Sequence, residues 1–238
     1  RAVKPLLDAL ADSREQQQRI GIEVLSYVQN KSAGAALFNF ARGNADRDLR
    51  MRAMLACGTL GDTAMWRRFR DFLEPPTGGQ TSRDPVAVAA TWGLARLGET
   101  RARGLLTRLM NAPSPEIRAL AALGLGRIGK PGDAAELLRV ASSVDSGPLT
   151  RAAAITALGN FKRKQDRVHF LAFSESEEIT IRRATLLALA RSAPPPSEKT
   201  TPLSTAFSAR LAEALLQPDT PLQQSALAAA TLWHGKSK

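Results

Sequence analysis

The feature that most constrains the fold of this chain is an internal repeat with a period of about 31 residues. Two stretches show it best, PEIRALAALGLGRIG at residues 115–129 and LTRAAAITALGNFK at residues 149–162. Each has an arginine near its start, followed by a run of small and apolar residues. Aligning these arginines and extending in both directions gives seven matching positions: Gln18, Arg50, Ala87, Arg118, Arg151, Arg182 and Gln223. A period of this length indicates stacked supersecondary units.

The spacing of this arginine column is regular apart from two long intervals. The successive spacings are 32, 37, 31, 33, 31 and 41 residues. The 37-residue interval contains EPPTGGQTSRD at 74–84, and the 41-residue interval contains APPPSEKTTP at 193–202. Both stretches are rich in proline and polar residues, which favour loops. We therefore predict two loop insertions in an otherwise regular array.

The other columns of the alignment have the period of an amphipathic α-helix. Relative to the arginine column, apolar or small residues recur at −1, +3, +6, +7 and +10, which places them on one stripe of a helix. Residues at +3 and +6 are nearly all small, which would let two helix backbones approach closely. A shorter amphipathic segment precedes each of these helices, at 3–11, 33–41, 64–73, 100–110, 133–142, 167–174 and 208–216. A hairpin of two such helices buries its apolar face only against neighbouring hairpins, so we predict an all-α solenoid.

At this level of detail the units resemble HEAT repeats, in the short bacterial form also found in phycobilisome-lyase-like proteins. The resemblance rests on PEIRALAALGLGRIG and on ADRDLRMRAMLACGTLGD at 45–62, and it extends from about Val3 to Trp233. It implies one α-solenoid domain over residues 1–238, a right-handed superhelix of about seven helical hairpins. The units are expected at about 2–30, 31–61, 62–98, 99–129, 130–162, 163–192 and 203–234. The first and last have glutamine in the arginine column, and terminal repeats are expected to deviate.

The arginine column itself is the most regular polar feature. In HEAT repeats the matching arginine hydrogen-bonds within or between units. The resemblance therefore implies a structural ladder that fixes the stacking of the hairpins. The alternative is a row of arginines that faces a ligand. The column consists of Arg50, Arg118, Arg151 and Arg182.

A second basic set is better placed to bind a partner. Three of its members share one column near the C-terminal end of the second helix of their units, and the other three lie close to that column. Stacking would align these charges along one edge of the solenoid as a positive strip. The simpler explanation is that they complement the helix dipole. The set consists of Arg96, Arg127 and Arg191, with Lys162, Arg163 and Lys164.

The segment MWRRFRDF at 65–72 adds Arg67 and Arg68 to the candidate binding residues. Basic residues interleaved with aromatic ones can contact nucleic acid through phosphate pairing and stacking. In the alternative, Trp66 and Phe69 share the core face of a helix and the arginines are solvated. We prefer this second interpretation for the aromatic residues.

The sequence contains no convincing catalytic, metal-binding or cofactor-binding motif. His169 and His234 have no ligand partners at helical spacing, and the single cysteine, Cys57, is expected in the core. The glycines of GLGRIGK at 124–130 belong to the packing and turn columns of the repeat rather than to a phosphate loop. We therefore expect a protein that is not an enzyme and needs no cofactor.

The charge of the chain points to an acidic partner. The formal net charge is +11, from 33 Lys and Arg against 22 Asp and Glu. Such a charge attracts acidic surfaces without choosing among protein, nucleic acid and lipid. We expect a protein-interaction scaffold that binds an acidic protein on a basic solenoid face, with nucleic-acid binding through the same surface as the alternative. A chromophore-lyase-like or glycosylase-like enzyme ranks below both.

The compartment is the last expectation that the sequence supports. No apolar run approaches the roughly 20 residues of a membrane span, so we expect a soluble protein without a membrane span. The chain begins with Arg1 instead of methionine, which indicates a processed product or an excised domain. We favour the cytoplasm, and the missing methionine keeps the periplasm open as an alternative.

Overall fold

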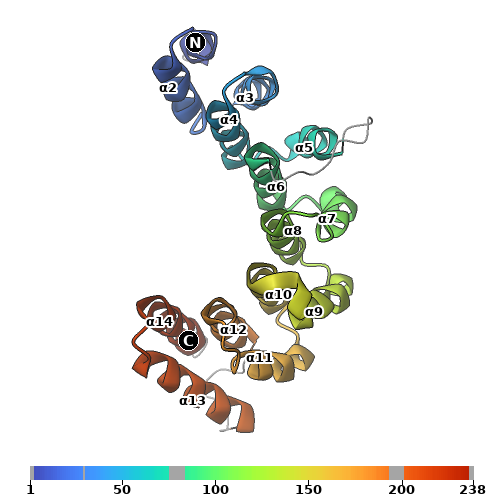
Figure 1. The fold of residues 1–238 in the computed structure, drawn as a ribbon, viewed down its shortest axis with the longest axis vertical. Coiled ribbons are helices and arrows are strands. Elements are labelled where there is room, and N and C mark those ends of the chain that lie inside the picture. Colours follow the sequence, from blue (N-terminus) through green and yellow to red (C-terminus); the bar gives the residue numbers. More distant parts are fainter. Residues whose placement is uncertain (1–2, 29, 75–83, 193–200, 236–238) are drawn as a thin grey trace. The chain divides into compact units, whose positions relative to one another are not determined.

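A computed structural model describes residues 3–28, 30–74, 84–192 and 201–235 of the chain. These residues form 14 α-helices and no strand. Along the chain, the helices alternate between two layers and pair into hairpins (Figure 1). The predicted all-α solenoid is thus confirmed. None of the helices in these ranges combines the length and the hydropathy needed to cross a membrane.

The helices fall into two sets, named here A and B for the first and second helix of each hairpin. Short 3₁₀ turns lead into several of them, such as Thr63–Met65 before α5 and Lys164–Asp166 before α11. The A helices are α1 (Val3–Leu10), α3 (Lys31–Gly43), α5 (Trp66–Leu73), α7 (Arg103–Leu109), α9 (Ala134–Ser142), α11 (Arg167–Phe173) and α13 (Pro202–Leu216). The B helices are α2 (Glu15–Leu25), α4 (Arg47–Thr59), α6 (Pro85–Leu97), α8 (Pro115–Ile128), α10 (Gly147–Phe161), α12 (Ile179–Ser192) and α14 (Thr220–His234).

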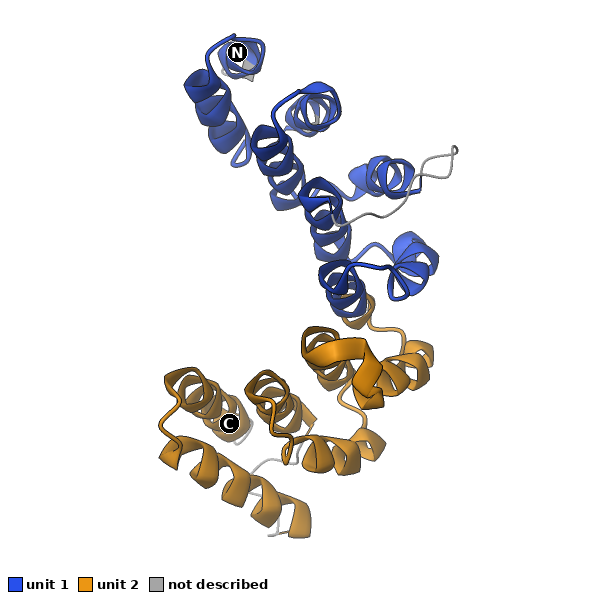
Figure 2. Ribbon diagram, in the orientation of Figure 1, with its two compact units in different colours: residues 1–124 blue, residues 125–238 orange. Residues whose placement is uncertain are grey.

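The chain divides into two compact units (Figure 2). Unit 1 is Arg1–Gly124 and contains α1 to α7 with most of α8. Unit 2 is Leu125–Lys238 and contains the end of α8 with α9 to α14. The two predicted loop insertions lie almost entirely outside the described residues, which omit 75–83 and 193–200.

The last A helix begins earlier than predicted, at Pro202 instead of residue 208. Thr201 starts it with a capping box: the Thr201 hydroxyl accepts the Ser204 N–H at 3.1 Å, and the Ser204 hydroxyl accepts the Thr201 N–H at 2.8 Å. Proline suits the first helical position because its φ is already helical and its missing N–H would have no partner there. The last residue of the predicted insertion at 193–202, Pro202, is therefore the first residue of this helix.

Several B helices, among them α4, α6 and α14, begin at side-chain caps, and some B helices end at left-handed residues. Asp46 accepts the Leu49 N–H at 2.8 Å at the start of α4, which satisfies one of the free amides of the first turn. Gly98 follows α6 with φ 62°, a conformation that glycine adopts without strain. After α10 the same place is occupied by Lys162, with φ 54°. These boundaries keep the B helices between 11 and 15 residues long.

Neighbouring B helices pack through small residues at very short range. A Cβ atom added to Gly58 of α4 would lie 2.7 Å from the Gly93 Cα of α6. In unit 2, a Cβ atom on Gly126 would lie 2.5 Å from the Ala157 Cα. Gly58 and Gly126 both stand at position +8 from the arginine column, whereas Gly93 and Ala157 stand at +6. Stacking therefore brings the +8 position of one B helix against the +6 position of the next.

Large apolar side chains from the A helices fill the space between the two layers. Phe69, Phe170 and Phe207 are fully buried, and each comes from an A helix. Phe69 lies against Gly93, where a Cβ atom would be 2.7 Å from the phenylalanine Cζ. The core thus combines large residues on A helices with small residues on B helices.

Candidate functional site

The arginine column joins the two helices of single hairpins. The Arg50 Nε–H donates to the Ala41 carbonyl at 2.9 Å, and the Arg151 Nε–H donates to the Ala141 carbonyl at 2.9 Å. Both carbonyls lie in the last turn of an A helix, where the helix itself supplies no donor. Arg118 likewise donates to the Ala112 carbonyl at 2.9 Å, just beyond α7. These arginines bond inside a hairpin, and their donors are directed at the protein backbone.

The two glutamines of the column make the same contact. Gln18 donates from Nε2 to the Asp12 carbonyl at 2.7 Å, and Gln223 donates to the Gln217 carbonyl at 2.9 Å. Arg182 departs from this pattern, because its Nε is buried without a hydrogen-bond partner in the described part of the chain. The contacts of Gln18 and Gln223 show that one amide donor on a long side chain is sufficient to bond the backbone carbonyl.

This contact predicts different outcomes for two substitutions of one residue. Arg151→Ala leaves the Ala141 carbonyl without its donor and is expected to lower the free energy of unfolding by about 1–2 kcal/mol. Arg151→Gln is expected to retain at least about half of that stability, since glutamine makes the contact in the two terminal hairpins. Urea denaturation followed by circular dichroism measures both. Equal losses for the two variants would contradict this role.

The predicted basic strip is divided between the two units. Arg96 is exposed in the last turn of α6 in unit 1, and its guanidinium lies 5.5 Å from the centroid of the Trp92 ring. Arg127 is exposed and Arg191 is half-buried, and both belong to unit 2. The continuity of the strip stays a prediction.

Residues 162–164 differ from one another in surroundings. Lys162 and Lys164 are exposed. Arg163 is half-buried, donates to the Pro131 carbonyl at 3.4 Å and lies 3.5 Å from the carboxylate of Asp166. Burial raises the pKa of Asp166 above its ordinary value, and the charge of Arg163 opposes this shift. The Arg163 side chain is therefore engaged in the turn before α11, whereas the two lysines extend into solvent.

Arg67 and Arg68 lie on α5, an A helix, and both are exposed. The Arg68 guanidinium lies 5.7 Å from the centroid of the Phe38 ring on the neighbouring α3. Trp66 and Phe69 are buried. The aromatic residues of this segment thus belong to the core, and the two arginines lie on a different helix layer from Arg96.

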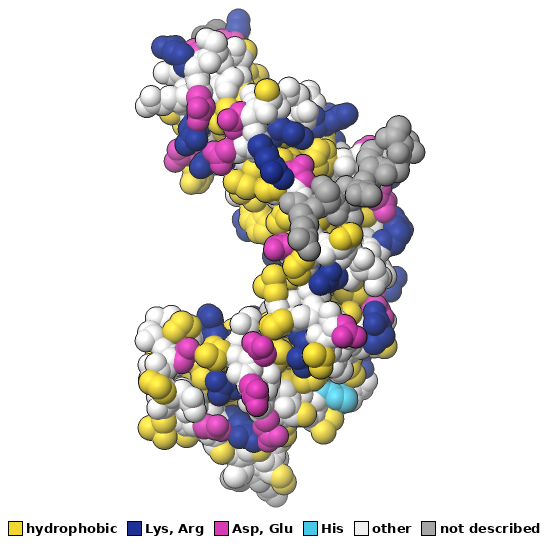
Figure 3. All heavy atoms as spheres, in the orientation of Figure 1, with side chains coloured by type: hydrophobic (Ala, Val, Ile, Leu, Met, Phe, Trp, Pro, Cys, Tyr) yellow, Lys and Arg dark blue, Asp and Glu magenta, His cyan; other side chains and the backbone are white. Residues whose placement is uncertain are grey.

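An open groove crosses the B helices α4, α6 and α8 of unit 1, with a volume of about 750 Å³. In the space-filling view, hydrophobic side chains gather in this part of the unit, over α4 and α6 (Figure 3). All but one of the lining residues are apolar, and the exception is a glutamate. The groove is lined by Met51, Leu55, Pro85, Val88, Ala89, Trp92, Pro115, Glu116 and Leu120.

Side chains at positions +1 and +5 from the arginine column form the centre of this apolar groove. Met51 and Leu55 occupy these positions on α4, and Val88 and Trp92 occupy them on α6. All four are half-buried. The Trp92 ring lies over Gly58, where a Cβ atom would be 2.7 Å from the indole Cζ3. The close approach at Gly58 therefore places a flat aromatic ring in the floor of the groove.

The rim of the apolar groove is charged. Arg47 at the start of α4 pairs with Asp84, the cap of α6, at 3.3 Å. Glu116 accepts a hydrogen bond from the Ser114 hydroxyl at 2.6 Å at the start of α8. Arg96 lies at the opposite end of α6 and forms no ion pair with the residues that the structure describes. The charged groups at the N-terminal ends of these helices therefore have polar partners, whereas Arg96 at the C-terminal end of α6 has no acidic partner among the described residues.

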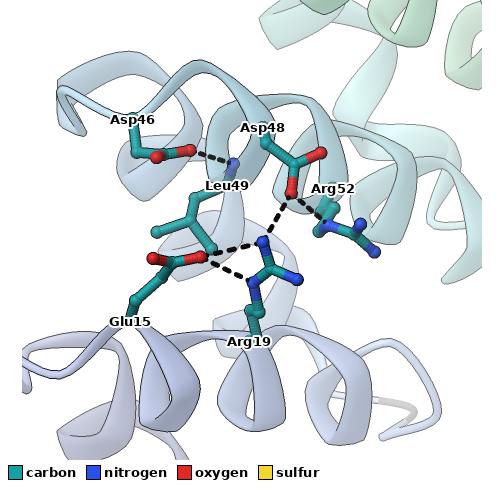
Figure 4. A network of polar contacts seen from close by, with 6 residues as sticks. All are labelled: Glu15, Arg19, Asp46, Asp48, Leu49 and Arg52. Carbon is teal, nitrogen blue, oxygen red and sulfur yellow. Dashed lines mark hydrogen bonds and ion pairs between the residues drawn. The ribbon is translucent and has the colours of Figure 1, made fainter.

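A second groove, of about 460 Å³, lies between α2 and α4 and differs in character. Arg19 bridges the two helices, because it pairs with Glu15 at 2.8 Å and with Asp48 at 3.3 Å (Figure 4). Arg52 also donates to Asp48, at 2.6 Å, and this bond lowers the pKa of the aspartate. Charges pair with one another here, so the apolar groove is the stronger candidate site.

Residues 80–148 match the sequence profile of a family described as HEAT repeats. This part of the chain consists of HEAT repeats. The matched range contains the whole of α6, α7, α8 and α9. Two of the three helices that line the apolar groove, α6 and α8, thus lie inside the matched repeats.

Two solved structures resemble the chain along nearly its whole length. Human deoxyhypusine hydroxylase in complex with glycerol is 18% identical, with 98% of this chain and 85% of that chain covered and a TM-score of 0.45. An engineered protein is 16% identical, with 99% and 97% covered and a TM-score of 0.41. No curated protein matches the sequence.

The titratable residues of the chain do not gather into a metal-binding cluster within the described ranges. Cys57 is buried in α4, and its thiol donates a long hydrogen bond of 3.6 Å to the Gly34 carbonyl of α3. Burial raises the pKa of this thiol to about 12, which keeps it protonated and unreactive. His169 and His234 are both exposed. The cysteine is thus a core residue, as the sequence predicts.

Sequence reasoning missed the apolar groove. The repeat columns show only what all units share, and the +1 and +5 columns are apolar in only some units. A usable signal was present in the pairs Met51 with Leu55 and Val88 with Trp92. Each pair is apolar at a spacing of four residues and lies off the core stripe.

Proposed function

We propose that this chain is a protein-interaction scaffold whose apolar groove binds an amphipathic, acidic segment of a partner protein. The observation that carries the proposal is the groove itself: about 750 Å³, open, almost wholly apolar, and formed by three parallel B helices. Contiguous apolar surface on a water-soluble fold marks a binding site, since leaving it in water is unfavourable. A helix with apolar anchors along one face suits such a groove.

The charges around the groove favour carboxylates on the partner. Arg96 lies one helical turn beyond Trp92, so an anchor side chain on the Trp92 ring would bring its neighbours close to the guanidinium. A carboxylate there would pair with a cation that has no acidic partner in the described structure. The net charge of +11 adds a long-range attraction for acidic proteins.

Nucleic acid fits the same surface less well. Phosphate binding requires arginines and lysines whose charge is available. At the rim of the apolar groove, Arg47 pairs with Asp84, and the groove itself is lined by apolar side chains and one glutamate. These features support a protein segment as the occupant.

A pair of fluorescent peptides tests the proposal. Both have leucines at helical spacing along one face, and the other positions carry glutamate in one peptide and lysine in the other. We expect the acidic peptide to bind at least roughly tenfold more tightly, because only its charges complement Arg96 and the net positive charge. Fluorescence anisotropy measures the two dissociation constants.

Matched variants locate the binding surface. Val88→Glu places a charge in the groove and is expected to abolish binding, while Val144→Glu, at a valine that is 78% exposed outside the groove, is expected to change nothing. Arg96→Glu is expected to weaken the binding of the acidic peptide by about tenfold. Arg67→Glu makes the same change of charge on α5 and is expected to weaken this binding by less than about twofold. Thermal melts check the fold of each variant.

Two results would overturn the proposal. One is that the wild-type protein binds neither peptide, or that it binds a peptide with an affinity that Val88→Glu leaves unchanged. The other is tighter binding of duplex DNA than of either peptide, with a steep loss between low and physiological salt, which would indicate phosphate contacts.

A further inference from the structure

The turns that follow the B helices of unit 2 lie side by side in one row. Arg163, in the turn after α10, donates to the Pro131 carbonyl in the turn after α8 at 3.4 Å. Arg167, which ends the same turn and begins α11, donates to the Ser192 carbonyl at the end of α12. Hydrogen bonds thus connect the turn after α10 with both of its neighbours. The C-terminal ends of α8, α10 and α12 therefore form one continuous edge of unit 2 (Figure 2).

Among the described residues of this edge, all fully exposed charges are positive. The turns contain two aspartates, Asp133 and Asp166, but these residues are buried, at 5% and 2% exposure. Four cations in and beside the turns are exposed, and none of them forms an ion pair with the residues that the structure describes. We name the surface that these four cations form the basic edge. It consists of Arg127, Lys130, Lys162 and Lys164.

Most exposed acidic residues in the described part of unit 2 lie at the other ends of the B helices. Asp145 precedes α10, and Glu177 and Glu178 precede α12. Helices of 14 to 15 residues are about 20 Å long. Since physiological salt screens charges beyond roughly 8 Å, these carboxylates do not neutralise the basic edge. An anionic partner is therefore attracted to one edge of the unit.

Lys162 holds a backbone conformation that glycine would adopt more easily. Its φ of 54° and ψ of 31° are left-handed, where the Cβ atom of an L-residue crowds the next carbonyl oxygen. It is the only residue other than glycine with positive φ in the described part of the chain. The same position, +11 from the arginine column, is a glycine after α4, α6 and α8, namely Gly61, Gly98 and Gly129. A lysine that the turn does not need indicates a use for its exposed ammonium group.

We propose that the basic edge binds an extended acidic segment of a partner protein, whose carboxylates pair with the exposed cations. Neighbouring helices pack about 8–10 Å apart, and three residues of an extended chain span about 10 Å. Acidic side chains at every third position would therefore meet successive turns. The apolar groove lies in unit 1, so the basic edge is a second surface that goes beyond the function proposed above.

The composition of the basic edge favours carboxylates over the phosphates of nucleic acid. All but one of its cations are lysines, which carry a point charge instead of the planar fork with which arginine binds phosphate. No phenylalanine, tyrosine or tryptophan in the described part of unit 2 is exposed, so nucleic-acid bases would find no ring on which to stack. The basic edge also has fewer cations than the roughly six to ten phosphate contacts that give tight, salt-sensitive binding of DNA. A polypeptide is therefore the better occupant.

A fluorescent peptide with glutamate at every third position and serine elsewhere tests the proposal. It has no apolar side chain for the groove. We expect the wild-type protein to bind it at low ionic strength, and Lys164→Glu to weaken this binding by about fivefold. Arg67→Glu makes the same change of charge on α5 and is expected to weaken the binding by less than about twofold. Fluorescence anisotropy measures the dissociation constants.

Lys162→Gly separates the requirement of the partner from that of the turn. Glycine relieves the left-handed backbone, so the melting temperature is expected to rise by about 1–3 °C. The same variant loses one cation of the basic edge and is expected to bind the peptide about threefold more weakly. Thermal denaturation and anisotropy measure the two effects. A variant that binds as tightly as the wild type, or that is less stable, would show that the lysine serves only the turn and would refute the proposal.

Two further results would count decisively against the basic edge. One is that the wild-type protein does not bind the peptide at low ionic strength, or that Arg67→Glu impairs binding as much as Lys164→Glu. The other is that duplex DNA binds more tightly than the peptide and that Lys164→Glu abolishes this DNA binding, which would indicate a phosphate-binding surface.

Failure of the basic edge is distinguishable from failure of the apolar groove. Val88→Glu lies in the groove and is expected to change the binding of the glutamate–serine peptide by less than about twofold. Conversely, Lys164→Glu is expected to change the binding of the leucine-containing acidic peptide by less than about twofold. Each variant therefore removes one binding surface and leaves the other.

Discussion

Gly126→Ala is expected to lower the free energy of unfolding by about 2–3 kcal/mol. The added methyl group would lie 2.5 Å from the Cα and 2.6 Å from the Cβ of Ala157, which are closer than non-bonded carbons approach. The obstructing atoms belong to a helix backbone and its first side-chain carbon, so they cannot rotate away. Relief requires α8 and α10 to separate, which opens the packing on both sides. Chemical denaturation followed by circular dichroism measures the loss.

Gly104→Ala is the matched control for this prediction. Gly104 also lies within an α-helix, α7, but a Cβ atom there would meet only the Arg108 side chain, at 3.8 Å. Alanine favours helix over glycine, so this variant is expected to gain about 0.5–1 kcal/mol. If both variants shifted stability in the same direction, the close approach of the B helices would not be the cause.

Phe69→Ala is expected to cost more, about 3–5 kcal/mol. The Phe69 side chain is 0% exposed and lies edge-on to Phe38, with ring centroids 6.2 Å apart. Its removal leaves a cavity between α5 and the backbone of α6, which the surrounding helices fill only in part. Denaturation of the purified variant measures the change.

A second substitution at Gly93 distinguishes lost packing from a general loosening of the fold. In the wild type, Gly93→Ala is expected to be destabilising, because its methyl group would lie 2.7 Å from the Phe69 Cζ. In the Phe69→Ala background the same methyl group enters the cavity instead. The two changes are therefore expected to couple by more than about 1 kcal/mol. Additivity within about 0.5 kcal/mol would contradict direct contact between the two sites.

The helical array could be predicted from sequence because its cause is local and repeated. Small residues at +6 and a polar donor in the arginine column recur in unit after unit, and each recurrence supports the same hairpin. The start of α13 could not be read in this way. Pro202 continues a proline-rich run, and only the capping bonds between Thr201 and Ser204 show that it belongs to the helix.

The candidate site could be predicted less well, because it depends on how separate helices meet. Met51, Val88 and Leu120 come from three helices, and no spacing within any one of them indicates that their side chains line the same groove. The basic residues present a similar difficulty. Arg163 and Lys164 are neighbours in sequence, yet only Arg163 contacts an acidic side chain, Asp166.

Cys57 gives the protein a natural reporter. It is the only cysteine of the chain, and its thiol lies between α4 and the Gly34 carbonyl of α3. A thiol reagent reaches it only when this hairpin opens, so the rate of labelling counts opening events in a protein without substitutions. Met51 and Leu55, on the same helix, line the apolar groove. A partner bound in the groove would hold the hairpin closed. Slower labelling of the Cys57 thiol would therefore indicate that the partner is bound.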